Sequence, residues 1–171
     1  LDITKIEAGS MKLNMVKTNI PNLISSILPA AQNLIKEKVI KIEVNHQENL
    51  PEILVDRNRI SQVIMNIISN AAKFTDYGKI TISTSIEKVN NTNHEIIITI
   101  NDTGIGINKV DQDRLFKPFE QSNTTDKNRS FGSGLGLTIS KSLVQLHQGR
   151  IGLLQSKPGE GSTFFIALPV Q

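Results

Sequence analysis

The sequence predicts a single α+β domain in which a mixed sheet is covered on one face by three helices. Three stretches repeat apolar residues at the i, i+3, i+4 spacing of a buried helix face, and several others alternate apolar and polar residues as strands do. The chain has 171 residues, which suits one substantial domain and is short for two.

The first quarter of the chain contains four predicted elements. Residues 1–9 have helical character that stops at a glycine, like the tail of a helix whose body lies upstream. Residues 11–15 alternate apolar and polar side chains and predict a short strand. The Asn-Ile-Pro sequence at 19–21 predicts the start of a helix, and Pro29 within that helix predicts a kink. Residues 40–44 alternate again and predict the next strand.

A predicted helix over residues 60–75 organises the rest of the chain, and Asp56 is placed to cap it. One face of this helix carries an apolar stripe that we expect to pack into the core: Ile60, Val63, Ile64, Ile67, Ile68 and Ala71. Another face gathers polar side chains, each within one turn of the next: Gln62, Asn66, Asn70 and Lys73.

This polar face has two interpretations. Polar helix faces are usually solvated, but Asn is less favourable than Ala in a helix by roughly 0.5 kcal/mol, and solvated faces favour Glu, Lys and Gln. The amide oxygens of Asn66 and Asn70 are neutral hard ligands suited to Mg²⁺, and Lys73 can neutralise phosphates. The alternative to a solvated face is therefore a site for a metal and a nucleotide.

Residues 79–86 and 95–100 predict an antiparallel hairpin with a long solvated loop. Residues 111–117 predict a short helix. Residues 120–134 have no periodicity and are rich in polar side chains and glycine, so we expect a mobile loop.

The C-terminal part of the chain predicts one helix and two strands. Helical spacing resumes over residues 135–146, and Gly149 is placed to cap the end of that helix. Residues 150–155 and 162–168 predict two strands around a turn, which close the sheet.

The sequence Asp102-Thr103-Gly104-Ile105-Gly106 follows a predicted strand. Its carboxylate would lie at a sheet end and accept hydrogen bonds, as the exocyclic amine of adenine requires, and its glycines would let the backbone approach a flat ligand. The alternative is an ordinary turn, because Asp and Gly are common in turns.

A glycine-rich run precedes the helix at 135–146. Backbone N–H groups and the helix dipole collect phosphates where such a loop meets a helix start. The run lacks the Lys-Ser/Thr of a Walker-type loop, and its spacing differs from the dinucleotide fingerprint, so neither common nucleotide fold is supported.

The composition excludes several classes of function. The net charge is +3, with one Tyr and no Trp, which disfavours nucleic-acid binding. Cysteine is absent, which excludes disulfides and fits a reducing compartment. No apolar run reaches the roughly 18 residues of a membrane span, and there is no signal-peptide pattern. Because the chain opens with Leu1, we expect that it was cut from a longer polypeptide.

Five motifs in series resemble the N, G1, F, G2 and G3 boxes of sensor histidine kinases, and together they span nearly the whole chain. They are Asn66-x-x-x-Asn70-Ala-x-Lys73-Phe74, Asp102-x-Gly-x-Gly, Phe116-x-x-Phe119, Gly132-x-Gly-Leu-Gly-Leu and Gly159-x-Gly-Ser-Thr-Phe164. Residues 1–9 also resemble the end of the dimerisation and phosphoacceptor hairpin with its linker, which leaves residues 10–171 as the catalytic domain.

The resemblance implies the Bergerat fold, a two-layer α/β sandwich with a mobile ATP lid, shared with gyrase, chaperone and mismatch-repair ATPases. It implies that the following residues bind ATP: Asn66, Asn70, Lys73, Phe74, Asp102, Gly104, Ile105, Gly106, Phe116, Phe119, Lys127, Arg129, Gly132, Ser133, Gly134, Leu135, Gly136, Leu137 and Thr163. In this scheme Asn70 coordinates Mg²⁺ with help from Asn66, Asp102 binds the adenine amine and Thr163 lies under the base. Lys127 and Arg129, in the lid, either close onto the phosphates or are simply solvated.

The implied activity is that of a protein-histidine kinase. Lys73 favours a kinase, because gyrase-like and chaperone-like members usually carry an acidic residue there. The cofactors would be ATP and Mg²⁺. The partners would be the protein's own dimerisation and phosphoacceptor domain, in a homodimer, and a response-regulator receiver, in the cytoplasm and without direct membrane contact.

None of the three histidines is interpreted as the phosphoacceptor. We therefore expect the fragment alone not to phosphorylate itself. His147 is expected to favour the dipole at a helix end. The alternatives are a scaffold that has lost nucleotide binding and an independent gyrase-like ATPase.

Overall fold

A five-stranded mixed sheet forms one layer of the molecule. The structure is a computed structural model, and it describes residues 4, 6, 8–118 and 134–171. The strand order is β2 (Val39–His46), β4 (Tyr77–Lys88), β5 (His94–Asp102), β7 (Gly161–Pro169) and β6 (Arg150–Lys157). Strands β2 and β4 are parallel, and every other neighbouring pair is antiparallel. The predicted mixed, mostly antiparallel sheet is therefore confirmed.

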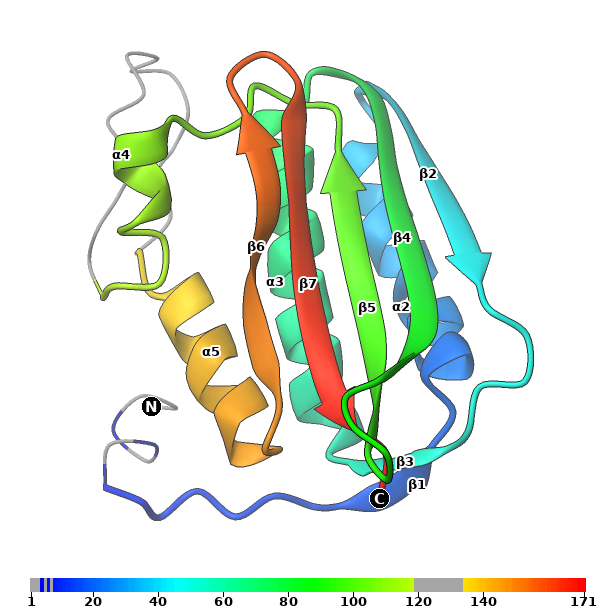
Figure 1. Cartoon of the computed structure of the whole chain (residues 1–171). Helices are drawn as coiled ribbons and strands as arrows, with labels where there is room; N and C mark the ends of the chain where they lie inside the picture. Colours follow the sequence, from blue (N-terminus) through cyan, green and yellow to red (C-terminus); the bar gives the residue numbers. More distant parts are fainter. Residues whose placement is uncertain (1–3, 5, 7, 119–133) are drawn as a thin grey trace.

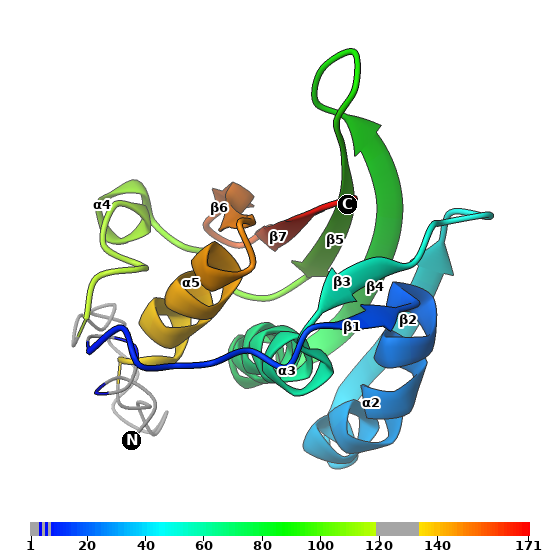
Figure 2. The same ribbon diagram turned by 90° about the horizontal axis from the view of Figure 1, so that it is seen from below.

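Three helices form the second layer and cover one face of this sheet (Figures 1 and 2). They are α2 (Ile20–Ile35), α3 (Arg57–Phe74) and α5 (Gly136–Leu146). The core between the layers is rich in isoleucine, and its largest fully buried side chains are Ile20, Ile24, Ile53, Ile60, Ile64, Ile67, Ile68, Ile80, Ile82, Ile96, Ile98 and Ile100. The apolar stripe predicted on the central helix is buried throughout.

Helix α3 begins three residues earlier than the apolar periodicity indicates, because its cap lies at Asp56. The Asp56 Oδ1 atom accepts hydrogen bonds from the backbone N–H groups of Asn58 at 3.1 Å and Arg59 at 3.2 Å, which confirms the predicted cap. The cap also ties α3 to the N-terminal segment, because the Asn14 N–H donates to Asp56 Oδ2 at 2.9 Å.

One prediction in the N-terminal half was wrong in detail. No strand forms at residues 11–15. Instead β1 (Val16–Thr18) pairs antiparallel with β3 (Ile53–Val55), which the sequence did not indicate. Helix α2 starts as predicted, because the side chain of Asn19 accepts from the Asn22 N–H, and it runs through Pro29 as one helix of 16 residues.

The short helix predicted at 111–117 lies earlier, at α4 (Lys109–Gln112), because Asn108 caps it. The mobile loop predicted at 120–134 lies almost entirely outside the described residues. Within those residues, no helix is long and apolar enough to cross a membrane.

The end of α5 differs from the prediction, because the left-handed position falls on Gln148 (φ 59°) and not on Gly149. The Gly149 N–H donates to the Val144 carbonyl and the Gln148 N–H to the Gln145 carbonyl, each at 2.9 Å, as in a Schellman motif. Gly149 is needed for another reason, since a Cβ there would overlap the Ala167 carbonyl oxygen.

His147 joins the end of α5 to the start of α3. It is 2% exposed, its Nδ1 lies 2.7 Å from the Leu143 carbonyl oxygen, and its Nε2 accepts from the Asp56 N–H at 3.0 Å. Nε2 can accept only when it carries no proton, so this arrangement requires the neutral ring with its proton on Nδ1. The contact with the Leu143 carbonyl lies in the last turn of α5, at the helix end where His147 was expected to act.

Candidate functional site

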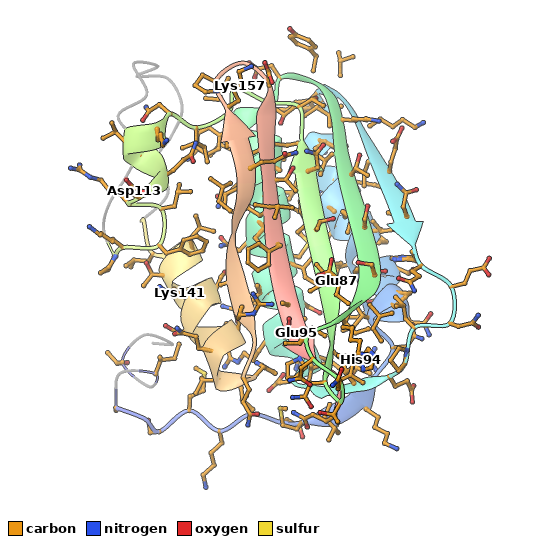
Figure 3. The ribbon with its side chains drawn as sticks, in the orientation of Figure 1. Glu87, His94, Glu95, Asp113, Lys141 and Lys157 are labelled. Atoms are coloured by element: carbon orange, nitrogen blue, oxygen red, sulfur yellow. The ribbon has the colours of Figure 1, made fainter. Side chains whose placement is uncertain are left out.

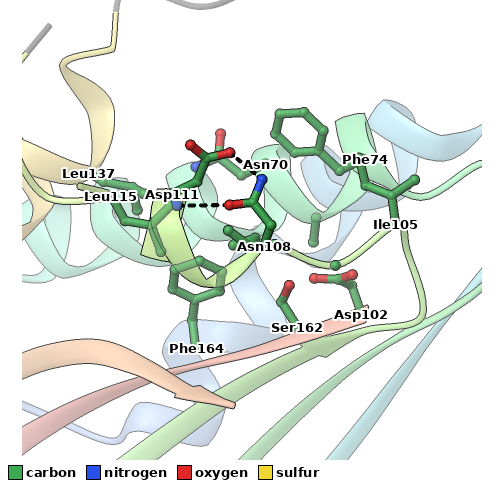
Figure 4. A pocket seen from close by; sticks show the side chains of 13 residues that line it. Asn70, Phe74, Asp102, Ile105, Asn108, Asp111, Leu115, Leu137, Ser162 and Phe164 are labelled. Atoms are coloured by element: carbon green, nitrogen blue, oxygen red, sulfur yellow. Dashed lines mark hydrogen bonds between the residues drawn. The ribbon is translucent and has the colours of Figure 1, made fainter. Parts of the chain in front are cut away.

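A pocket of about 100 Å³ lies where the C-terminal end of α3 meets the end of β5 (Figure 4). Its walls are mainly apolar: Ala71, Phe74, Ile105, Ile107, Leu115, Leu137 and Phe164. Gly106 also lines it, together with five polar residues: Asn70, Asp102, Asn108, Asp111 and Ser162. An apolar slot with a few polar groups at fixed positions suits a flat ring with polar edges.

Asp102 supplies a buried acceptor at one end of the pocket. It is the last residue of β5, is 6% exposed, and accepts a hydrogen bond from the Gly104 N–H at 2.8 Å. Burial raises the pKa of Asp102, and backbone hydrogen bonds from Gly104 and Ser162 act in the opposite direction. A ligand that donates a hydrogen bond here would therefore find a carboxylate in an otherwise apolar setting.

The loop after Asp102 lies between α3 and the β6–β7 turn and is hydrogen-bonded to both. The Ile105 N–H donates to the Phe74 carbonyl at 3.1 Å, and the Gly159 N–H donates to the Ile105 carbonyl at 2.7 Å. Neither Gly104 nor Gly106 has room for a Cβ beside the neighbouring backbone, and Gly106 has a φ of 69°. Gly104 does not line the pocket, so its role here is to pack the loop against α3 and not to contact a base.

The polar face of α3 is divided between the pocket and α5. Asn70 and Phe74 line the pocket. Asn66 lies against the first turns of α5, where its Nδ2 donates to Ser140 Oγ at 3.0 Å. Lys73 places its Nζ 5.4 Å from the centroid of the Phe74 ring, a cation–π contact. Asn66, Asn70 and Lys73 of the predicted face are therefore partly buried, whereas Gln62 is exposed.

Helix α5 starts beside the pocket, which Leu137 lines from its first turn. Gly134 adopts a φ of 70°, and the cap residue Leu135 has no side-chain hydrogen bond to the helix. Gly136 packs so closely on Asn66 that a Cβ would overlap the amide oxygen. The N–H groups of this first turn thus lack a side-chain cap within the described residues, and a helix start of this kind attracts anions.

Phe116 lies outside the pocket lining, where it is partly buried against the core, and its carbonyl accepts from Thr138 Oγ1 at 3.3 Å. Five predicted site residues lie outside the described residues: Phe119, Lys127, Arg129, Gly132 and Ser133.

The prediction for Thr163 was wrong, because Ser162 occupies the position expected of it. Thr163 is paired with Asn101, whose Nδ2 donates to its Oγ1 at 2.7 Å, whereas Ser162 pairs with Asp102 in the strand register and lines the pocket. Side chains alternate between the two faces of a strand, so Ser162, opposite Asp102, shares its face, whereas Thr163 lies on the other face.

Sequence reasoning also missed the pocket wall formed by α4. Asn108 accepts from the Asp111 N–H at 2.9 Å and donates from Nδ2 to Asp111 Oδ2 at 2.8 Å, and both residues line the pocket. The Asn-x-x-Asp spacing is a capping signal that could have located this helix.

The predicted metal site consists of amide oxygens. Among the described residues, no cluster of three or more His, Asp or Glu side chains could hold a metal ion. The donor chemistry of Asn70, a neutral oxygen in the same pocket as Asp102, fits a magnesium ion that is shared with phosphates and water.

The comparisons with known proteins agree with this geometry. Residues 55–171 match the family described as histidine kinase-, DNA gyrase B- and HSP90-like ATPases. The autoinducer 2 sensor kinase/phosphatase LuxQ of Vibrio vulnificus is 36% identical over 173 residues, covering 100% of this chain and 20% of that protein. The non-motile and phage-resistance protein of Caulobacter vibrioides is 36% identical over 172 residues, with the same coverage. The chain thus spans about a fifth of the length of these relatives.

Two solved structures extend the comparison. Full-length ShkA in complex with AMPPNP superposes with a TM-score of 0.81 and 26% identity, covering 98% of this chain and 33% of that one. The catalytic domain of the histidine kinase ThkA superposes with a TM-score of 0.72 and 23% identity, covering 92% of this chain and 98% of that one, which supports the fold alone.

Proposed function

We propose that this chain acts as a phosphoryl donor. It belongs to the family of histidine kinase-, DNA gyrase B- and HSP90-like ATPases and is a catalytic ATP-binding domain of the sensor histidine kinase type. In this role the domain binds Mg-ATP and donates the γ-phosphoryl group to a histidine on an upstream helical hairpin. A response-regulator aspartate then receives the group. The full-length protein is a homodimer, and this domain works in the cytoplasm.

The pocket around Asp102 receives the adenine. The carboxylate accepts a hydrogen bond from the exocyclic amine, and Ser162, on the same face, offers a hydroxyl to the base edge. Phe74, Ile105 and Phe164 provide apolar surface for the ring. The observation that carries the proposal is this buried acceptor in an apolar slot that also reaches Asn70 and the uncapped start of α5.

The phosphates extend from the base toward α5. The first-turn N–H groups of α5 bind them, and Lys73 neutralises part of their charge, with Lys127 and Arg129 contributing from the lid. Asn70 and Asn66 hold the ion through their amide oxygens, and the Asn66 amide nitrogen is already bonded to Ser140. Mg²⁺ would supply charge neutralisation on the phosphates. The protein groups position the triphosphate, which is the main requirement of phosphoryl transfer.

The receiving histidine lies on another segment, because the histidines of this chain are poorly placed. His147 is buried with both ring nitrogens engaged. His94 (Figure 3) begins β5 and Asp102 ends it, so the two lie at opposite ends of the strand. The Nδ1 atom of His46 faces Thr84 Oγ1 at 2.7 Å, within the sheet. This arrangement supports donation to a separate hairpin.

The test is a transfer assay with γ-labelled Mg-ATP. The chain is incubated alone and with the separately produced hairpin of its parent protein. We expect label on a hairpin histidine only in the mixture. Label on the chain itself would contradict the proposal, and steady ATP turnover by the chain alone would support a gyrase-like ATPase instead. An absence of nucleotide binding would favour a scaffold.

A further inference from the structure

The hydroxyl of Thr75 is buried without a partner. Thr75 follows α3 as its C-terminal cap and is 0% exposed. Among the described residues, only two buried side-chain polar atoms have no hydrogen-bond partner, and Thr75 Oγ1 is one of them. An unpaired buried hydroxyl destabilises the folded state, so this one calls for an explanation.

Two acceptors lie near this hydroxyl, and the Asp102 carboxylate is the charged one of the two. Thr75 Oγ1 and Asp102 Oδ1 each lie 2.8 Å from the point at which a Cβ on Gly104 would sit, so both oxygens flank the same spot. The Phe74 carbonyl, also beside that spot, already accepts from Ile105. The Thr75 carbonyl is held separately by Lys38, whose Nζ donates to it at 2.9 Å.

We propose that Thr75 is a positioning residue for Asp102, and that its hydroxyl donates a hydrogen bond to the carboxylate when a nucleotide fills the pocket. The inference rests on the proposed function, because it concerns the carboxylate that accepts the base amine. Asp102 needs to be ionised for that task, yet burial raises its pKa. Among the described residues, the backbone N–H groups of Gly104 and Ser162 donate to it, and a hydroxyl donor adds to them.

A purely structural role for Thr75 and the proposed positioning role predict opposite changes in the stability of the free protein. If the hydroxyl stabilised the helix end, its removal would destabilise the free protein. If it is held for Asp102 in the loaded state, Thr75→Val removes an unpaired polar group and stabilises the free protein while weakening nucleotide binding. The two effects of one substitution then have opposite signs.

Thr84 offers a matched control. It is also buried, at 3% exposed, but its Oγ1 lies 2.7 Å from His46 Nδ1 and is hydrogen-bonded. Thr84→Val should therefore lower the unfolding midpoint and leave nucleotide affinity unchanged, because it lies outside the pocket lining. Thr75→Ser keeps the hydroxyl and should bind like the wild type.

The experiment measures thermal unfolding of the free proteins and calorimetric affinity for two probes. The probes are a non-hydrolysable ATP analogue and the triphosphate of purine riboside, which lacks the exocyclic amine. For Thr75→Val we expect an unfolding midpoint higher by about 2–4 °C and about tenfold weaker binding of the ATP analogue, which is the scale of one hydrogen bond to a charged group. Binding of the purine riboside probe should be nearly unchanged.

The inference is overturned if Thr75→Val binds the ATP analogue as tightly as the wild type, if it weakens both probes equally, or if it lowers the unfolding midpoint. A failure of the proposed function gives a different result, because the wild-type protein itself would then bind neither probe.

Discussion

Helix α3 has a buried aspartate beside each of its ends, and the two are partnered differently. At the start, the Asp56 carboxylate accepts from three backbone N–H groups, while its own N–H donates to His147. At the other end, Asp102 is just as buried but faces a pocket. Thr75, nearby, has a hydroxyl with no partner. The fully paired end holds the fold together, and the underpaired end is left for a ligand.

The pKa shifts of the two carboxyl groups follow this difference. Burial alone would raise the pKa of Asp56, but the N–H groups of Asn14, Arg59 and Asn58 outweigh it and the pKa is lowered. Asp56 therefore stabilises the fold above its unfolded pKa, and this stability is lost as the pH falls through its folded pKa. For Asp102 the pKa is raised, so its contribution is present below its unfolded pKa and lost as the pH rises through the folded one.

The largest expected effect is on binding at the pocket end. Asp102→Asn replaces the charged acceptor by an amide and should weaken ATP binding by about 100-fold, because a hydrogen bond to a charged group is lost from a buried site. Competition with a fluorescent ATP derivative measures this. The same variant should unfold at or above the wild-type temperature, since the buried charge is removed. Wild-type affinity in this variant would show that Asp102 does not read the base.

The capped end should show the reverse pattern. Asp56→Ala removes the helix cap and the acceptor for Asn14, and should lower the free energy of unfolding by about 2–3 kcal/mol. Urea denaturation measures the loss. ATP affinity, measured where the variant is still folded, should stay within about twofold of the wild type. A large loss of affinity without a loss of stability would reverse the comparison between the two ends.

Because the pKa of Asp102 is raised, we expect the affinity for the base to weaken at acidic pH. Protonation removes the acceptor, so affinity should fall by up to about tenfold for each pH unit below the folded pKa of this group. The fall should begin above the usual range of an Asp carboxyl. Adenosine is the appropriate probe, because it carries no titrating phosphate. A flat adenosine affinity across that range would contradict the assignment of Asp102 as an ionised acceptor.

The smallest effect is a gain in stability beside the capped end. Gln148 adopts a φ of 59°, which is unfavourable for a residue with a Cβ, so Gln148→Gly should stabilise the fold by about 0.5–1 kcal/mol. Gly149→Ala is the control and should be destabilising, because its Cβ would overlap the Ala167 carbonyl oxygen. Thermal unfolding distinguishes the two. ATP affinity should not change for Gln148→Gly.

The sequence predicted best the elements whose signals are local. The stripe of α3 and its Asp56 cap lie within one stretch of chain, and so do the two strands of the β4–β5 hairpin. Pairing between distant segments was missed. Strands β1 and β3 have three residues each, and Val16 pairs with Val55, so neither shows enough alternation to be found alone.

The predictions for the candidate site show the same contrast between local signals and pairing of distant segments. Asp102 was predicted from its place after a strand and Asn70 from the polar face of its helix, and both line the pocket. Ser162 lines the pocket in place of Thr163 because of the register between β5 and β7, and that register is decided by strand pairing. The pocket wall formed by α4, with Asn108 and Asp111, was missed because the helix is marked by the cap at Asn108 and not by a repeat of apolar residues.

The central claim is that the underpaired end of α3 holds a magnesium triphosphate of adenosine. Calorimetric titration of the wild-type chain with a non-hydrolysable ATP analogue, with and without Mg²⁺, tests it most directly. We predict saturable heat at one site per chain, with tighter binding when the ion is present. An absence of heat with the ion in excess would contradict the account.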